Sequence, residues 1–314
     1  MADFDDDLII GDSNAGHDRS GSPSDRIIPQ TERFFSLFRN RTSHIIAVVN
    51  QKGGCGKTTT AINLAASLAA GGYKVLVVDT DPQAQASLGV GVDVPRLEAS
   101  IYDVLIHGAT LESVVQPAGV KNLFIAPAQS GLSGAQLELA SFMARESVLK
   151  LALDDYLQAE HFDFILIDCS PTLNLVTINA LTAAHSVLVP FQTHYFSLEG
   201  MKELFETIDI VKERLNPMLS TLGIAVTLFD KRLKVNHEID RQIREYFGDL
   251  VFDTRIHLNV KLCEAPMHRV PVIVYAPKST GSKEYQALAR EVIMRCHSSF
   301  SGSHKLRHQS IVPK

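Results

Sequence analysis

The sequence predicts an α/β fold with a doubly wound, mainly parallel sheet and helices on both of its faces. Short apolar runs such as "FILID" alternate with segments of helical periodicity from His44 onward. Several of these runs contain almost no polar residue, which is typical of parallel strands that are buried on both faces. Strand and helix patterns that alternate through most of a chain predict a sheet covered by helices on each side.

The apolar runs and helical patterns place the individual elements in order. We expect strands over 44–50, 74–79, 122–127, 162–168, 186–191, 222–228 and 250–256. We expect helices over 57–70, 134–158 with a break, 198–215, 235–247 and 282–297. The first helix stops at a Gly-Gly pair and the third at Asn-Pro, both of which are helix-ending signals. Ligands of such sheets bind at the carboxyl ends of the strands, so functional motifs are expected there.

Composition divides the chain into three parts. Residues 1–43 form an acidic N-terminal extension that we expect to be disordered, with one short amphipathic segment, "TERFFSLFRNR". Residues 44–297 form the folded domain, and residues 298–314 form a flexible C-terminal tail. With 45% hydrophobic and 21% charged residues, the whole chain of 314 residues is typical of a globular protein.

Several classes of protein are disfavoured. No apolar run approaches the ~18 residues of a membrane-spanning helix, so we expect no stable membrane insertion. The N-terminus, "MADFDDDLII", lacks the basic region of a secretory signal. The four cysteines are scattered without a C-x-x-C pair, which argues against structural zinc or a disulfide framework and indicates a cytoplasmic protein.

The charge is distributed unevenly along the chain. Residues 43–229 hold 18 acidic and 10 basic residues, a balance of −8. Residues 230–314 hold nine acidic and 15 basic residues, a balance of +6. A basic part of this kind is either an ordinary solvated surface or a surface that faces a polyanion.

The stretch "NQKGGCGKTT" predicts a phosphate-binding loop between the first strand and the first helix. Gly53, Gly54 and Gly56 allow the backbone N–H groups to turn towards phosphate oxygens, and the following helix adds its positive dipole end. Lys57 is placed to reach the phosphates, and the hydroxyl of Thr58 to bind Mg²⁺. We interpret Cys55 as a small spacer within the loop.

This loop departs from the usual pattern at its start. Where the first glycine is expected the chain has Gln51, and a second lysine, Lys52, follows directly.

Two strands end in carboxylates. "VLVVDTDPQ" places Asp79 and Asp81 at the end of the second strand, and "FDFILIDCSP" places Asp168 at the end of the fourth. At the mouth of a phosphate site, such carboxylates orient an attacking water or hold Mg²⁺. We therefore expect Asp81 and Asp168 to belong to the same site as the loop.

The sequence resembles the ParA-type partition ATPases, in the Soj-like branch of the deviant Walker A superfamily of P-loop NTPases. The resemblance extends from about Ile45 to Val292. It rests on "KGGCGKTT", "DTDPQ", "DFILIDCSP", "VPFQTHYFSLEG", "VTLFDKR", "NVKLCEAP" and "YAPKSTGSKEYQALAREV". These seven motifs stand in the order that the family has.

The resemblance implies ATP and Mg²⁺ as cofactors and a slow, Mg²⁺-dependent ATPase activity. It makes Lys52 the signature lysine, which crosses the interface of an ATP-sandwich homodimer and touches the nucleotide of the other subunit. It implies catalytic roles for Lys52, Lys57 and Asp81, and metal binding by Thr58 and Asp168. The implied nucleotide contacts are Lys52, Gly53, Gly54, Cys55, Gly56, Lys57, Thr58 and Thr59 around the phosphates, with Thr227 and His257 near the adenine.

The family binds DNA non-specifically and is stimulated by a ParB-like or other adaptor. The residues expected to contact DNA here are Lys231, Arg232, Lys234, Lys261 and Arg269. Leu258 stands where the family has an arginine, which weakens this expectation. The implied function is ATP-gated positioning or segregation of a cargo, which is a chromosome, a plasmid or a protein assembly, on the nucleoid.

The alternative is a MinD-like regulator that cycles on a membrane or a protein matrix without binding DNA. Such a protein ends in a basic amphipathic helix that lies on lipid. The C-terminal stretch here, "RCHSSFSGSHKLRHQSIVPK", is rich in Ser and His and has no such face. An iron–sulfur relative requires cysteines at a dimer interface or in a C-x-x-C pair, and neither is present.

Overall fold

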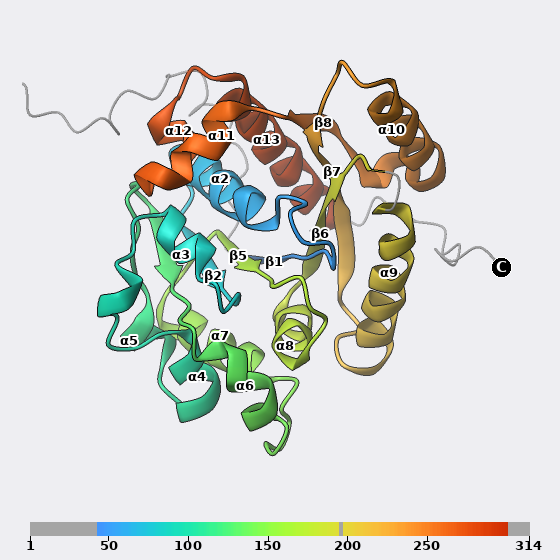
Figure 1. The fold of residues 1–314 in the computed structure, drawn as a ribbon. Helices are drawn as coiled ribbons and strands as arrows, with labels where there is room; N and C mark the ends of the chain where they lie inside the picture. Colours follow the sequence, from blue (N-terminus) through green and yellow to red (C-terminus); the bar gives the residue numbers. More distant parts are fainter. Residues whose placement is uncertain (1–42, 195–196, 301–314) are drawn as a thin grey trace, which may run out of the picture.

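The computed structural model of the protein describes residues 43–194 and 197–300. Its centre is one sheet of eight strands in the order β3-β4-β2-β5-β1-β6-β7-β8 (Figure 1). All neighbouring strands run parallel except β3, which pairs antiparallel with β4 at one edge. The α/β fold expected from the sequence is therefore confirmed. The predicted acidic extension, its amphipathic segment and the tail beyond residue 300 lie outside the described residues.

The strands are β1 (His44–Val48), β2 (Val75–Asp79), β3 (Gln116–Pro117), β4 (Leu123–Ala126), β5 (Phe164–Asp168), β6 (Ser186–Gln192), β7 (Ser220–Phe229) and β8 (Val251–His257). The α-helices are α2 (Lys57–Ala70), α3 (Gln85–Gly89), α4 (Ile101–His107), α5 (Leu111–Val114), α6 (Leu132–Leu139), α7 (Val148–Ala159), α8 (Leu175–Ala183), α9 (Ser197–Arg214), α10 (Lys234–Phe247), α11 (Val260–Glu264), α12 (Val272–Tyr275) and α13 (Thr280–Phe300). Short 3-10 turns follow at η2 (Val94–Arg96), η3 (Gly248–Leu250) and η4 (Ala265–His268).

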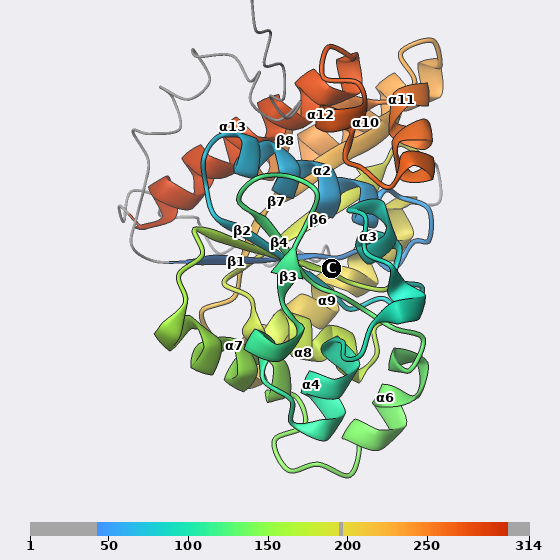
Figure 2. The same ribbon diagram turned by 90° about the vertical axis from the view of Figure 1, so that its left-hand side faces the viewer.

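Helices cover both faces of the sheet. Helices α2, α11, α12 and α13 lie on one face, and α4 to α9 lie on the other (Figures 1 and 2). Each face buries its own hydrophobic cluster. Along β1 the side chains divide between the clusters, with Ile45 and Ala47 in one and Ile46 and Val48 in the other. This explains why the run "HIIAVV" carries no polar alternation.

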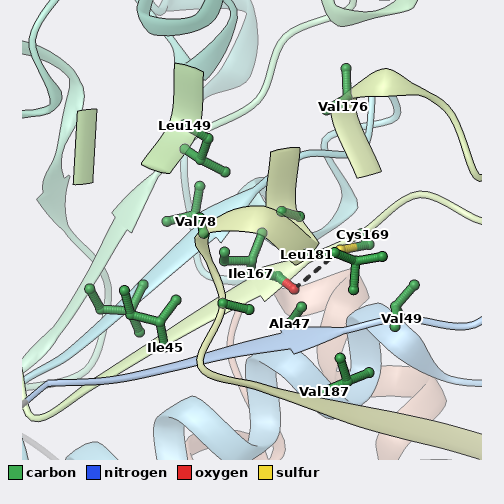
Figure 3. Close-up of a cluster of buried hydrophobic side chains, with 14 of the residues drawn as sticks. Ile45, Ala47, Val49, Val78, Leu149, Ile167, Cys169, Val176, Leu181 and Val187 are labelled. Atoms are coloured by element: carbon green, nitrogen blue, oxygen red, sulfur yellow. Dashed lines mark hydrogen bonds between the residues drawn. The ribbon is translucent and has the colours of Figure 1, made fainter. Parts of the chain in front are cut away.

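Figure 3 shows part of the cluster beneath the centre of the sheet. Side chains from β1, β2 and β5 meet those of α7 and α8, among them Leu149, Val176 and Leu181. Because all of these residues are almost completely buried, the central strands are fixed in place. The loops at their carboxyl ends are thus attached to a rigid base.

The predicted strands all exist, with bounds that differ by one or two residues. The long helical pattern over 134–158 is divided into α6 and α7, as expected for a broken helix. Seven helices and strands of the described ranges were not predicted, namely α3, α4, α5, β3, α8, α11 and α12. The last helix continues to Phe300, three residues beyond the end expected for it from the sequence.

The open edge of β8 is occupied by carboxylates of α13. Glu284 accepts a hydrogen bond from the backbone N–H of His257, and Glu291 accepts from those of Asp253 and Thr254. These bonds satisfy donors that an edge strand otherwise exposes. Within the described ranges, no helix is both long and apolar enough to cross a membrane.

Candidate nucleotide-binding site

The loop between β1 and α2 lies at the carboxyl edge of the sheet. Gly56, at the N-terminus of α2, has φ 87°, a left-handed conformation that favours glycine. Asn50, just after β1, connects two parts of the edge: its side chain donates to the carbonyl of Pro190 at 2.7 Å and accepts from the backbone N–H of Lys52 at 3.0 Å. The start of the loop is therefore held against β6.

The other end of the loop is held by β7. The Thr227 hydroxyl donates a hydrogen bond to the carbonyl of Cys55 at 2.7 Å, across 172 residues of sequence. The same side chain would be the nearest neighbour, at 3.7 Å, of a Cβ added to Gly56. Cys55 is fully buried, and this burial raises the pKa of its thiol, as fits a spacer.

Inside the loop, the side chain of Lys57 contacts the backbone of Lys52. The ammonium of Lys57 donates to the backbone carbonyl of Lys52 at 3.0 Å. Lys57 is buried, whereas Gly53 and Gly54 between the two lysines are exposed. The loop thus presents backbone groups to solvent around a lysine that is already positioned at its centre.

The ends of β2 and β5 bring two carboxylates together beside the loop. Asp79 and Asp168 are direct register partners on neighbouring strands, and both are fully buried. Burial, followed by the negative charge of Asp79, raises the pKa of Asp168 well above its ordinary value. The Thr58 hydroxyl and the Lys57 ammonium act in the opposite direction. The residues expected to bind metal and phosphate therefore do converge.

The surroundings of the Asp168 carboxylate are suited to a bound cation. Among the described residues, neither of its carboxylate oxygens has a hydrogen-bond partner. A buried carboxylate without donors is costly unless a cation or its water shell compensates the charge. With the hydroxyl of Thr58 nearby, the donor set is the oxygen-only set that Mg²⁺ prefers.

Asp79 and Asp81 have different surroundings although they are two residues apart. Asp79 accepts hydrogen bonds from the backbone of Asp81 and from Ser87. Burial raises the pKa of Asp79 to about 6, against the opposing effect of the bonds from Ser87 and Asp81. Asp81 is half-buried, and its carboxylate accepts from the backbone N–H of Gln83. Of the two, only Asp81 therefore has surface to offer a ligand.

The two residues expected near the adenine are engaged within the protein. Thr227 is 2% exposed, and its hydroxyl supports the phosphate loop as described above. His257 is held by Glu284, with its ring Nδ1 2.6 Å from a carboxylate oxygen and its ring edge on Phe229. A contact of either residue with a base stays a prediction.

The five residues expected to contact DNA are all exposed. Lys231, Arg232 and Lys234 follow β7 and Lys261 follows β8, whereas Arg269 lies beside Gly91, just after α3. Arg232 makes a two-pronged ion pair with Asp230, at 2.9 and 2.7 Å, and Lys261 pairs with Glu264 at 2.8 Å. Within 43–194 and 197–300, no ion pair is found for Lys231, Lys234 or Arg269. These three exposed cations are therefore not compensated by an ion pair among the described residues.

The sequence reasoning missed the residues that hold the site together. These are Asn50, Ser87 and Asn63, besides the supporting role of Thr227. Asn63 accepts a hydrogen bond from the backbone N–H of Val272 at 2.7 Å and donates to the carbonyl of Thr59 at 2.8 Å, so it joins α12 to α2. Each of them has at least one partner that is more than 40 residues away in sequence, so no local pattern marks its role.

Comparison with known proteins gives one consistent result. A family model described as "AAA domain" matches residues 43–221. The chain is 44% identical over 248 residues to the sporulation initiation inhibitor protein Soj of Bacillus subtilis, covering 79% of this chain and 97% of Soj. It is also 44% identical over 251 residues to the chromosome partitioning protein ParA of Myxococcus xanthus, covering 80% and 88%.

A solved structure has the same fold. Cobyrinic acid a,c-diamide synthase from Mycobacterium smegmatis, determined with a bound ATP analogue and magnesium, is 30% identical with a TM-score of 0.72. The similarity covers 82% of this chain and 97% of that one. Identity and coverage at the level of Soj and ParA are decisive: the chain belongs to the ParA/Soj family of partition ATPases.

Proposed function

We propose that this protein is a partition ATPase that segregates a chromosome by forming an ATP-dependent dimer on DNA. The observation that carries the proposal is the meeting of Lys57, Thr58 and Asp168 beneath a loop that presents a second lysine, Lys52. As a member of its family the protein hydrolyses ATP with Mg²⁺. The dimer, the DNA and the adaptor are the parts proposed here.

The chain's own residues divide the work of hydrolysis. Backbone N–H groups of the loop and the Lys57 ammonium bind the phosphates. The ammonium has two N–H donors available for this besides the one that it gives to the Lys52 carbonyl. Thr58 and Asp168 would hold Mg²⁺, which neutralises charge on the phosphates when it is bound. Asp81 orients the attacking water, since its carboxylate is half-buried at the rim of the site.

Lys52 supplies the dependence of the dimer on ATP. Its backbone is fixed within its own subunit at both its N–H and its carbonyl, by Asn50 and Lys57. Two facing sites filled with triphosphates repel one another, and a lysine contributed in trans turns this repulsion into attraction. The attraction exists only while the nucleotide is bound, so hydrolysis releases the dimer.

DNA binding is proposed to follow from dimerisation. One subunit offers few uncompensated cations, chiefly Lys231, Lys234 and Arg269, but two subunits double the contacts, and their free energies add. Contacts with phosphate carry no sequence information, so binding should be non-specific. Residence on the nucleoid would then report the ATP state, and a ParB-like adaptor would end it by stimulating hydrolysis.

The test is a gel-shift titration of the full chain on random-sequence duplexes with ATP, ADP or no nucleotide. We expect DNA binding in the presence of ATP but not with ADP or without nucleotide. For each contacted phosphate, a tenfold rise in salt concentration should lower the logarithm of the DNA affinity by ~0.9. ATP-specific binding that is absent even at low salt would contradict the DNA part of the proposal. Without turnover of Mg²⁺-ATP, measured by phosphate release, the whole proposal would fail.

A further inference from the structure

A buried carboxylate connects the loop that carries Asp81 to helix α3. One oxygen of Asp79 accepts a hydrogen bond from the backbone N–H of Asp81 at 3.1 Å. The other accepts two bonds from Ser87, from its backbone N–H at 2.8 Å and from its hydroxyl at 2.7 Å. Asp79 therefore joins Asp81, before the turn, to Ser87, after it.

Ser87 is itself held by a hydrogen bond from another segment of the chain. Its hydroxyl oxygen accepts a hydrogen bond from the backbone N–H of Ala128, in the segment that follows β4, at 3.0 Å. The hydroxyl thus donates to Asp79 and accepts from Ala128. Ser87 and Asp79 have no exposed surface, so neither side chain is available to a ligand in this structure. They can therefore affect a bound ligand only through the residues that they hold in position.

A second anchor holds the same turn on its opposite side. Thr80, between the two aspartates, donates to the backbone carbonyl of Asp168 from its N–H at 3.0 Å and from its hydroxyl at 2.7 Å. The backbone at Thr80 is thereby tied to β5, and the N–H of Asp81 is tied through Asp79 to α3. Among the bonds described here, the one from the Ser87 hydroxyl to Asp79 is the only one that holds this turn through a side chain from outside the "DTDPQ" motif.

We propose that Ser87 is a positioning residue for ATP hydrolysis, which orients Asp79 so that Asp79 holds the backbone of Asp81 at the reaction site. The inference rests on the proposed role of Asp81 in hydrolysis. It assigns Asp79 the role of an internal support, since its two oxygens already serve three donors.

Replacing Ser87 by alanine tests this directly. Ser87→Ala keeps the backbone donor but removes the hydroxyl, so Asp79 loses one bond and gains freedom to turn. We expect kcat for ATP to fall about tenfold, because small errors in the position of a catalytic group are costly. We expect KM to stay within about twofold, because Ser87 makes no bond to the phosphate loop among the described contacts.

Three further variants separate positioning from folding. Ser67→Ala is the matched control, since Ser67 is also buried but its hydroxyl bonds only to the carbonyl of Asn63 in its own helix. It should leave kcat unchanged. Ser87→Thr keeps the hydroxyl and should restore most of the rate. Asp79→Asn replaces one acceptor oxygen by an amide nitrogen, which cannot accept from Asp81 or Ser87, so kcat should fall at least as far as in Ser87→Ala.

The measurements are phosphate release at saturating and limiting ATP, with Tm of each variant. A kcat for Ser87→Ala and Asp79→Asn within twofold of the parent would overturn the inference, and so would equal losses in Ser67→Ala. If Ser87→Ala does not fold, Asp79→Asn decides alone. Failure of the parent to hydrolyse ATP would instead contradict the proposed function, which keeps the two outcomes distinct.

Discussion

The Nζ atom of Lys57 lies 3.0 Å from the backbone carbonyl oxygen of Lys52, to which it donates a hydrogen bond. The phosphate lysine and the additional lysine of this loop are therefore in direct contact. The bond ties the ammonium to the backbone of the loop and uses one of its three N–H donors, so two donors remain available to phosphate oxygens.

Loss of the Lys57 ammonium should nearly abolish ATP binding. A hydrogen bond to a charged group contributes about 1.5–3 kcal/mol, so the loss of contacts to two phosphates predicts an affinity reduced by roughly 100-fold or more in Lys57→Ala. Lys74→Ala is the control, because Lys74 precedes β2 at the other end of the sheet and pairs with Glu160. Calorimetric titration with ATP measures both. Similar affinities in the two variants would exclude Lys57 from the site.

Asp81→Ala should bind ATP normally and hydrolyse it poorly. The phosphate loop makes no described bond to Asp81, so affinity should stay within about twofold of the parent. Misplacement of an attacking water costs as much as about 100-fold in rate, and we expect a loss of that order. Phosphate release under single-turnover conditions is the measurement. A rate within threefold of the parent would remove Asp81 from the mechanism.

A charge reversal at Lys261 should weaken DNA binding without affecting the dimer. Lys261→Glu replaces an exposed cation and also frees Glu264, so two negative charges then face the DNA. Lys121→Glu makes the same change on an exposed residue just before β4, near the opposite edge of the sheet. Shift titrations with ATP should separate the variants by about tenfold. Equal losses would indicate a general charge effect instead of a DNA-binding surface.

Gly223→Ala should destabilise the fold. A Cβ at Gly223, in β7, would lie 2.4 Å from Arg295, 2.7 Å from the carbonyl of Leu250 and 2.7 Å from Phe252. Overpacking of this kind costs about 1–3 kcal/mol. Gly200→Ala is the contrast, since nothing lies within 4 Å and the residue is inside α9, where alanine gains about 1 kcal/mol over glycine. Thermal melts should shift in opposite directions, and a Tm of Gly223→Ala at or above the parent would contradict this packing.

The sheet could be predicted from sequence because its strands are buried on both faces and read as apolar runs. Helix α8 was missed because it is buried on nearly all sides, so "LVTINALTA" shows no polar face. Its one local signal is the N-cap Asn174, whose side chain accepts hydrogen bonds from the backbone N–H groups of Val176 and Thr177. The two-residue strand β3 contains Pro117 and has no strand signal of its own. Its pairing with β4 becomes apparent only in the folded chain.

The chemical groups of the site were predictable, but their supports were not. Lys57, Thr58 and Asp168 stand in recognisable motifs at strand ends, and strand ends of a parallel sheet meet at one edge. Thr227, by contrast, supports the carbonyl of Cys55 from 172 residues away. Ser87 follows Asp79 by eight residues, but its bond to that buried carboxylate requires the turn at Ala84, whose φ is 51°. Neither the contact of Thr227 across 172 residues nor the turn at Ala84 produces a periodic pattern in the sequence.

The central claim is that ATP joins two subunits through Lys52. Multi-angle light scattering of Asp81→Ala, in which hydrolysis should be slow, gives the most direct test. The account predicts a dimer with Mg²⁺-ATP, a monomer with Mg²⁺-ADP, and a monomer in both nucleotides when Lys52→Ala is added to Asp81→Ala. ATP affinity of the double variant, measured in parallel, should show that the site is still filled. A dimer that forms equally without nucleotide, or that survives the loss of Lys52, would contradict the account.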